Sequence, residues 1–451
     1  MHTGGVHLYS YPKGVDKNAY LSGLRDIFLD TSDLRPMFSQ RLANDLLSKT
    51  NLSFAWEQDQ AFDMEYHIRH SALPKPGRYR ELFALVSRLH STLLDRSRPL
   101  WEMYLIEGLE GNQFAIYLKI HHCMMDGAAS MHLFHAMLST SARGRLKHSP
   151  LSQQVWDQYR KHYPVVPRSL PVSRLDIKSL ADRLATQIGS GKQLAGALMQ
   201  YANVWAGGKT GLSVPWHGVP RSIISGKVTG SRRFVAQSWP FERVRAVGKA
   251  LGGTLNDAIL AMCAGGLRRY LILSDALPSR SLKAMVPMSL RVASDLDSAN
   301  AVGFIVANLA TDMKDPALRF ETIRKSTKAG KDVFSGLSAA EAELFTQITS
   351  SPLLLTKLLG LETTLPAFNL VISNVPGARE KMYLNGARLD GVYPASIIGN
   401  GQLLNITLVS YADQLDFGII ACRRALPSVQ RLIDCLEESL CELEELAGIP
   451  A

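Results

Sequence analysis

The feature that most constrains the fold is a change of composition in the middle of the chain, which separates two stretches of mixed strand and helix signals. Residues 141–234 hold 15 basic and only 3 acidic side chains, whereas the rest of the chain holds 35 basic and 37 acidic ones. Helical periodicity appears inside this segment, over residues 180–205. We therefore predict an N-terminal domain over residues 1–170, a basic helical linker over 171–230 and a C-terminal domain over 231–451.

Both flanking stretches interleave strand and helix patterns, which is typical of an α/β fold. In the first, we predict strands over 6–11, 54–56, 64–68 and 114–122 and helices over 17–29, 78–94 and 128–138. In the second, we predict strands over 233–239, 284–288, 302–310, 368–373, 403–410 and 415–422 and helices over 241–251, 256–272, 315–332 and 339–361. Asn256 is the expected N-cap of its helix. Hairpin turns are expected at Asn385-Gly386 and Asn400-Gly401.

A final helix closes the chain. Its apolar stripe consists of Val429, Leu432, Leu436, Leu440 and Leu443, and most of the neighbouring glutamates lie off that stripe. This pattern predicts a helix with one face packed on a core.

Composition excludes several classes of protein. Hydrophobic residues make up 46% and charged residues 20%, which excludes a disordered chain. No run of 18 apolar residues is present, so we expect no membrane-spanning helix. The five cysteines form no CxxC pair, which favours reduced thiols and a cytoplasmic protein. No metal-binding motif, GxSxG elbow or GxGxxG loop is present, and no basic strand interleaved with aromatic residues indicates nucleic-acid binding.

One cluster carries the chemistry: His121-His122-Cys123-Met124-Met125-Asp126-Gly127, an HHxxxDG pattern. In the preceding strand, His122 has the same parity as an apolar series, whereas His121 has the opposite parity. An imidazole at the end of an apolar face can keep a pKa near neutrality, which suits a general base. The alternative is a core histidine bonded to a backbone carbonyl. The apolar series consists of Phe114, Ile116, Leu118 and Ile120.

The residues that follow leave two roles open for Asp126. It can orient His122, or it can pair with an arginine and brace the loop, which we favour. Gly127 permits a backbone conformation that other residues resist. No nucleophilic Ser or Cys accompanies the motif, because the parity of Cys123 indicates a small apolar filler. A base without its own nucleophile suits direct transfer, in which a bound acceptor is deprotonated and then attacks.

HHxxxDG resembles the active-site motif of the CoA-dependent acyltransferase superfamily, which includes chloramphenicol acetyltransferase and the condensation domains of peptide synthetases. Four further segments, in order, resemble the bacterial wax ester synthase/acyl-CoA:diacylglycerol acyltransferase family. They are Pro99-Leu-Trp-Glu102, Asn256-Asp257, Val286-Pro-Met-Ser-Leu-Arg291 and Ser373-Asn-Val-Pro-Gly377. The resemblance covers nearly the whole chain, although members of that family usually begin about one helix earlier.

The resemblance implies two chloramphenicol-acetyltransferase-like sandwich domains with a helical linker and an active-site tunnel at their interface. It implies an O-acyltransferase that moves a long acyl chain from acyl-CoA to a fatty alcohol or diacylglycerol, without a metal or redox cofactor. His122 would be the base, and His121 and Asp126 would belong to the same catalytic motif. Either Arg41 or Arg291 would pair with Asp126.

We expect Asn256, Trp101 and Gly127 to contact the substrate. The competing interpretations are a plain N-cap for Asn256 and a core tryptophan for Trp101. The basic segment has two specific interpretations, which are holding CoA phosphates and docking on an anionic membrane or lipid droplet, beside that of a solvated linker. Two other functions remain open: a condensation-type enzyme that uses carrier-bound acyl groups, and a non-enzymatic lipid-surface or nucleic-acid binder.

Overall fold

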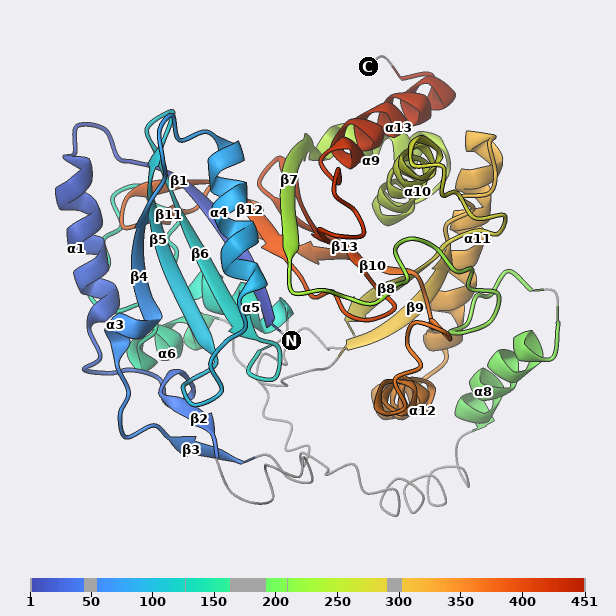
Figure 1. Ribbon diagram of the computed structural model, residues 1–451, viewed down its shortest axis with the longest axis horizontal. Coiled ribbons are helices and arrows are strands. Elements are labelled where there is room, and N and C mark those ends of the chain that lie inside the picture. The colour runs from blue at the N-terminus through green and yellow to red at the C-terminus, as the bar shows by residue number, and fades with distance from the viewer. Residues whose placement is uncertain are drawn as a thin grey trace.

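The computed structural model describes residues 2–43, 55–125, 127–162, 192–208, 210–289 and 302–449. Two mixed α/β units lie side by side, each built on a six-stranded sheet (Figure 1). The expected two-unit α/β architecture is therefore confirmed.

The first sheet draws its strands from both ends of the chain. In spatial order it contains β11 (Tyr383–Leu384), β12 (Ala387–Ala395), β1 (His2–Ser10), β6 (Gln113–His121), β5 (Trp101–Leu109) and β4 (Ile68–Ala72). β1 runs antiparallel to both β6 and β12, and β4 runs parallel to β5. The residue range that we predicted for the C-terminal domain thus contains two strands of the first sheet.

The second sheet contains only strands from the latter half of the chain. In spatial order they are β7 (Arg232–Pro240), β14 (Gln414–Cys422), β13 (Leu404–Tyr411), β10 (Leu370–Pro376), β8 (Lys283–Ser289) and β9 (Val302–Asn308). β10 is parallel to both β13 and β8, and the other pairs are antiparallel. Its outer face is covered by α9 (Phe241–Ala250), α10 (Leu255–Leu273), α11 (Pro316–Ser335) and α13 (Arg431–Ala447) (Figure 1).

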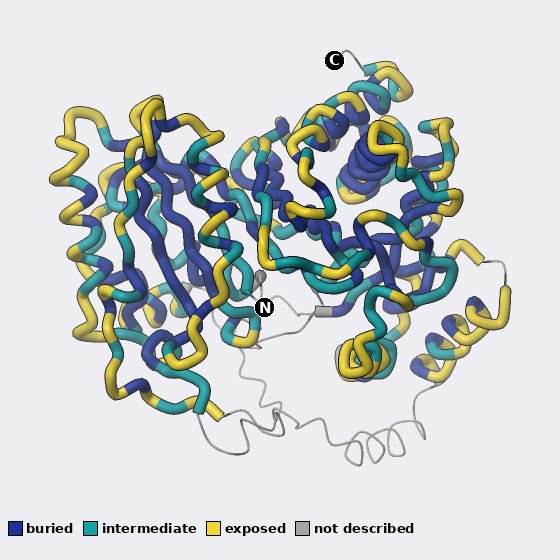
Figure 2. The backbone as a smooth tube through the Cα atoms, in the orientation of Figure 1, coloured by how far each residue is buried: buried dark blue, intermediate teal, exposed yellow. Residues whose placement is uncertain are grey.

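The first sheet is buried on both faces. One face packs against α1 (Lys17–Leu29) and α5 (Gly127–Ala136). The other packs against α4 (Tyr79–Ser91), which lies between this sheet and β7. The central strands are consequently buried along most of their length (Figure 2). The remaining elements of this unit are η1 (Pro36–Phe38), β2 (Gln40–Leu42), β3 (Trp56–Gln58), α3 (Met64–His67) and α6 (Gln153–His162).

Two more helices lie beside the second unit. α8 (Lys192–Trp205) and α12 (Ala339–Leu358) contact each other at one side of it (Figure 1). The apolar face of α8 is buried, because Leu194, Ala197, Tyr201 and Val204 pack on a cluster that includes Phe345. Docking on a lipid surface is one interpretation of the basic segment, and in α8, the part of its helical periodicity that the structure describes, the apolar face is packed on the protein itself. Residues 163–191 lie outside the described residues.

The described helices include no single one with both the length and the apolar composition of a membrane span. α9 and α10 meet that test only when they are taken together across a bend of 98°. The buried apolar residues of α10 belong to the core of the second unit.

Candidate active site

The HHxxxDG segment forms a turn between β6 and α5. β6 ends at His121, whose N–H donates to the carbonyl of Leu100 at 2.9 Å. The Met124 N–H then donates to the His121 carbonyl at 2.9 Å and closes a tight turn. α5 begins at Gly127, and Asp126 lies outside the described residues. The motif therefore connects a central strand to the N-terminus of a helix.

His121 holds its ring against its own turn. Its Nδ1 lies 3.3 Å from the Cys123 backbone N and 2.9 Å from Cys123 Sγ. Burial, reinforced by the positive charges of the N-terminus, Arg96 and His122, lowers the pKa of His121 to about 4. The ring is thus neutral near pH 7. Since Nδ1 accepts from the backbone N–H, the ring proton lies on Nε2.

His122 lies half-buried in the turn directly after β6. We predicted its direction from strand alternation, but β6 ends one residue earlier, so alternation no longer fixes where the ring points. The face argument also needs correction, because both faces of β6 are buried. Ala115, Tyr117 and Lys119, which have the parity of His121, pack in or beside the core under α4 as deeply as the apolar series packs on the opposite face.

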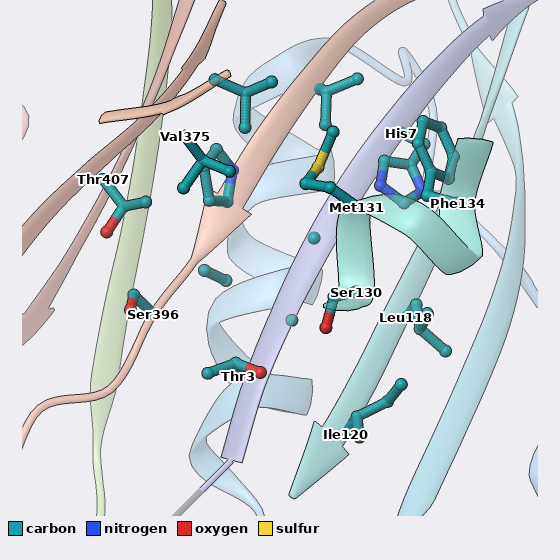
Figure 3. Close-up of a pocket in the computed structure, with 16 residues that line it drawn as sticks. Thr3, His7, Leu118, Ile120, Ser130, Met131, Phe134, Val375, Ser396 and Thr407 are labelled. Carbon is teal, nitrogen blue, oxygen red and sulfur yellow. The ribbon is translucent and has the colours of Figure 1, made fainter. Parts of the chain in front are cut away.

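An apolar pocket of about 100 Å³ is lined by residues from the strand before this turn and from the helix after it (Figure 3). Leu118 and Ile120 reach it from β6, and Ser130, Met131 and Phe134 reach it from α5. Its remaining wall comes from β1, from β10, β12 and β13, and from Ser396 just after β12. The pocket therefore lies between the two units, and its wall includes Ile120, the residue directly before the histidine pair. The tunnel that we expected at the interface stays a prediction.

The two ends of the pocket differ in polarity. Thr3, Ser130 and Ser396 lie at one end, whereas Met131, Phe134 and His7 lie at the other (Figure 3). A second, much narrower cavity lies beyond, with no room for a water molecule, and it shares Met131, Phe134, Val392 and Val409 with the first as lining residues. Met131 and Phe134 are the side chains of α5 that lie between the two.

A buried histidine holds the wall that contains Ser396. His90 Nδ1 lies 2.7 Å from the Tyr117 hydroxyl, and Nε2 lies 3.2 Å from the Ser396 carbonyl. Burial holds the pKa of His90 well below its usual value. A neutral ring matches both contacts, because Tyr117 can donate to Nδ1 while Nε2–H donates to the carbonyl.

Asn256 is not the N-cap that we predicted. Thr254 caps α10, and its hydroxyl forms a capping box with Asp257. Asn256 is exposed in the first turn, and its Oδ1 accepts a hydrogen bond from Asn374 Nδ2 at 2.8 Å. This bond joins the Asn256-Asp257 and Ser373–Gly377 segments, and the next residue along β10, Val375, lines the pocket.

Trp101 is fully buried in the core of the first unit. Its indole N–H donates to the Phe38 carbonyl at 2.8 Å, and its ring stacks on His67 at a centroid distance of 4.5 Å. Trp101 is not among the residues that line the pocket. This packing favours the core interpretation over substrate contact.

The partner of Asp126 is a question that the described residues leave untested. The guanidinium of Arg41 pairs with Glu57 at 3.0 Å and donates to the Ser97 carbonyl at 3.1 Å. Arg291, the other candidate, lies outside the described residues. Gly127 is the first residue of α5.

The sequence analysis missed most residues of the pocket. Thr3, Gly5 and His7 alternate along β1, and this pattern was the available signal, but we began the strand only at Val6. Met131 and Phe134 share a face of α5 by their spacing. Across the described ranges, no three His, Cys, Asp or Glu side chains form a group that could hold a metal ion.

Comparison with protein families matches both parts of the chain. Residues 1–259 match the wax ester synthase/diacylglycerol acyltransferase catalytic domain, and residues 298–444 match the C-terminal domain of the same family. A putative diacylglycerol O-acyltransferase of Mycobacterium tuberculosis is 42% identical over the whole chain and 96% of its own length. The O-acyltransferase WSD of Acinetobacter baylyi is 40% identical over 98% of this chain and 92% of its own.

Solved structures show the same relationship. A wax ester synthase/diacylglycerol acyltransferase from Marinobacter aquaeolei superimposes with a TM-score of 0.76 and 38% identity, covering all of this chain and 95% of that one. The first condensation domain of the CDA synthetase superimposes with a TM-score of 0.56 over all of this chain and 91% of that one, at 18% identity. The second likeness concerns the fold alone.

Proposed function

Because the chain belongs to the wax ester synthase/diacylglycerol acyltransferase family, we propose that it transfers a long acyl chain from acyl-CoA to a fatty alcohol or to diacylglycerol. The products are a wax ester and a triacylglycerol. The observation that carries the proposal for this chain is the apolar pocket whose wall includes Ile120, directly before the His121-His122 turn, and residues of α5, directly after it. An apolar space next to a titratable pair suits a substrate with a greasy tail and a reactive polar end.

In the proposed reaction, His122 is the general base. It takes the proton of the acceptor hydroxyl, and the oxygen attacks the thioester carbonyl. The tetrahedral intermediate then breaks its C–S bond, and protonated His122 gives its proton to the departing CoA thiolate. The result is one new C–O bond, one broken C–S bond and a regenerated imidazole.

Two features support His122 over its neighbour as the base. The pKa of His121 is about 4, so this ring is a poor proton acceptor near pH 7. Its Nδ1 is also occupied by the Cys123 N–H. His122 lies in the turn that leads into α5, whose N-terminus carries the positive end of the helix dipole. That end favours negative charge, such as the oxyanion of the tetrahedral intermediate.

The test compares alanine variants of the two histidines with acyl-CoA and hexadecanol or diacylglycerol, and it follows thiol release. We expect His122→Ala to lower kcat by at least about 100-fold, the usual contribution of a general base, with an unchanged melting temperature. His121→Ala should cost less. Equal losses in the two variants would refute this division of roles. Turnover with free acyl-CoA and no carrier protein separates the proposal from a condensation-type enzyme.

We further propose that the enzyme docks on an anionic lipid surface through the end of α12. Four leucines there, which we call the leucine face, are 48–75% exposed: Leu354, Leu355, Leu358 and Leu359. The outer side of α12 is among the exposed parts of the molecule (Figure 2). Exposed apolar clusters on one helix are typical of interfacial binding. The proposed substrates dissolve in lipid, and the excess of positive charge in residues 141–234 complements anionic headgroups.

Flotation with vesicles that contain anionic lipid tests this docking. Replacing both Leu355 and Leu358 with serine should weaken vesicle binding at least about tenfold, because two leucines no longer bury apolar surface in the lipid. Leu318→Ser is the matched control, since Leu318 is 61% exposed but lies on α11. Equal binding of the double variant and the control would contradict the proposal.

A further inference from the structure

His7 is a buried polar side chain without a polar partner. It is 6% exposed and lines the pocket, where its ring stacks on Phe134 at a centroid distance of 3.7 Å (Figure 3). No hydrogen bond joins either ring nitrogen to another of the residues that the structure describes. The other buried histidines on which the first sheet depends, His67 and His90, each bond to a backbone carbonyl.

The imidazole of His7 lines the pocket, and the described residues offer its nitrogens no hydrogen-bond partner there. Burial lowers the pKa of His7 to about 3, so the ring is neutral and carries one N–H donor and one acceptor nitrogen. Leaving buried donors and acceptors unpaired destabilises a protein, and almost all native groups avoid it. A ligand that offers an oxygen to this ring therefore gains binding energy that a purely apolar ligand lacks.

The direction of the ring is set by Gly5. A Cβ atom at Gly5 would lie 3.1 Å from His7 Nε2, so the imidazole extends over the glycine. Gly5 is paired with Leu118 of β6, and His2 is paired with His121. Nε2 therefore lies about three residues along β1 from the level of the histidine pair. That separation is ~10 Å, or about eight bonds of an extended alkyl chain.

The other polar groups of the pocket do not offer a free hydrogen-bond donor and acceptor at the depth of His7. The Thr407 hydroxyl already donates to Asn405 Oδ1 at 2.7 Å. Thr3 and Ser396 lie at the opposite end of the pocket, and the carbonyl of Ser396 accepts from His90 (Figure 3). Around His7 the pocket is lined by apolar side chains such as Met131 and Phe134. A ligand oxygen at this depth would meet His7.

We propose that His7 is a specificity-determining residue that hydrogen-bonds an oxygen on a long alkyl chain, about eight carbons from the reacting end. The inference rests on the proposed function, in which the pocket takes the alkyl chain of a substrate. The enzyme then accepts mid-chain hydroxylated substrates as well as plain ones. The oxygenated chain can belong to the acyl donor or to the alcohol acceptor, and the shared chemistry is a hydroxyl within an otherwise apolar chain.

Binding without turnover tests the acceptor arm. Affinities of the full-length protein for hexadecanol and for 1,4-, 1,8- and 1,14-hexadecanediol are measured by calorimetry in the absence of any acyl donor. We expect the 1,8-diol to bind about tenfold more tightly than the other two diols, as one buried hydrogen bond implies. The donor arm uses hexadecanoyl-CoA with a hydroxyl at carbon 4, 8 or 14 and no acceptor alcohol. The arm that shows the preference identifies which chain enters the pocket.

Three variants complete the design. His7→Leu should abolish the positional preference while retaining binding of unsubstituted chains, and His7→Gln should restore part of it, because glutamine also donates and accepts. Met131→Leu changes the same pocket without changing its polarity and should leave the preference intact. Absence of a positional preference in both arms, or a preference that survives in His7→Leu, would overturn the assignment. Failure to form ester from unsubstituted substrates would instead refute the proposed function, which separates the two outcomes.

Discussion

Asp416 is a buried carboxylate where the two units meet. Its Oδ1 accepts from the Ser238 hydroxyl at 2.6 Å, and its Oδ2 accepts from the Val392 N–H at 2.8 Å, so it joins β7 and β14 to β12. Burial raises the pKa of Asp416 to about 6, against which the two hydrogen bonds act. Val392 also lines the pocket. The protonation state of one residue is therefore linked to the contact between the units.

This linkage predicts a pH-dependent effect of Asp416→Asn. The folded state binds the proton of the Asp416 carboxyl more tightly than the unfolded state does. The stabilisation of the folded state that results is full below pH 4 and is lost as the pH rises through 6. Asparagine can keep both contacts, because its carbonyl accepts from Val392 and its amide donates to Ser238. We expect the free energy of unfolding of the variant, relative to that of wild type, to rise by on the order of 2 kcal/mol from pH 4 to pH 7, measured by urea denaturation.

The control for this experiment is Asp416→Ala. Alanine leaves the Val392 N–H unpaired and should destabilise the protein at every pH by about 1–3 kcal/mol. Parallel stability curves for wild type and Asp416→Asn across this pH range would show that the carboxylate does not titrate as its burial implies.

Among single residues, the position of the HHxxxDG motif before a helix could be predicted from the sequence, whereas the contacts of the residues around it could not. The pattern from His121 to Gly127 is contiguous, so its place before a helix was visible without coordinates. The roles of Asn256 and Trp101 depended on neighbours far away in the chain. Thr254 rather than Asn256 caps α10, because the hydroxyl two residues earlier completes the box with Asp257. For His7 the alternation along β1 was the only signal, because the absence of a partner is a property of the packed structure.

At the scale of elements, strong periodicity was sufficient to predict a helix or strand, whereas the patterns of short segments were not. α1 and the β13–β14 pair were predicted within one residue. The closing helix, predicted from its stripe alone, is confirmed as α13, and all five stripe residues are buried, although Val429 precedes the helix. The Asn385-Gly386 turn joins β11 and β12 with both residues at positive φ, as predicted. The strand predicted over 64–68 is wrong, since α3 occupies Met64–His67 under a side-chain cap from Asp63.

One strand that is buried along almost all of its length, β5, escaped the prediction. β5 has no alternation of polar and apolar residues, because its neighbours and the layers on both faces bury almost all of it. The helix predicted over 78–94 is confirmed as α4, and its apolar side packs on the core through Leu82, Leu85 and Leu89. Leu93 lies beyond the end of the helix and is 76% exposed. Periodicity therefore identified this amphipathic helix but not β5, whose sequence shows no alternation.

Met131 of α5 lies in the wall between the pocket and the narrower cavity beyond it. We therefore expect a smaller side chain at this position to change the substrate chain length that the enzyme prefers. Met131→Ala removes Cγ, Sδ and Cε from the wall between the two cavities. Since interiors are close-packed, the vacated volume admits about three more methylene groups. We expect the preferred chain length to rise by about that much, measured as kcat/KM over a series of saturated acyl-CoAs and alcohols. Met137→Ala, at a buried position outside both cavities, should lower stability without this shift.

At the scale of the whole molecule, the sequence order hides the way the units interlock. β11 and β12 lie in the first sheet, with β12 beside β1, although β10 before them and β13 after them in the sequence belong to the second (Figure 1). Local patterns cannot reveal this exchange, because a strand carries the same alternation whichever sheet it joins. The units are consequently coupled by covalent connections on both sides of β12, and the pocket contains residues from each.

β14 passes close to the backbone of β12 at Gly418, which predicts that an added side chain there destabilises the protein. A Cβ atom there would lie 1.8 Å from the Pro394 carbonyl oxygen of β12, and neither backbone can rotate away. Gly418→Ala should destabilise the protein by about 3 kcal/mol or more and reduce activity, because Pro394 lines the pocket. Gly196→Ala is the matched control, since nothing lies within 4 Å of an added Cβ in α8, and it should stabilise by about 0.5–1 kcal/mol. Thermal unfolding and ester formation measured on both variants decide the matter: similar melting temperatures would mean that β12 does not press against β14.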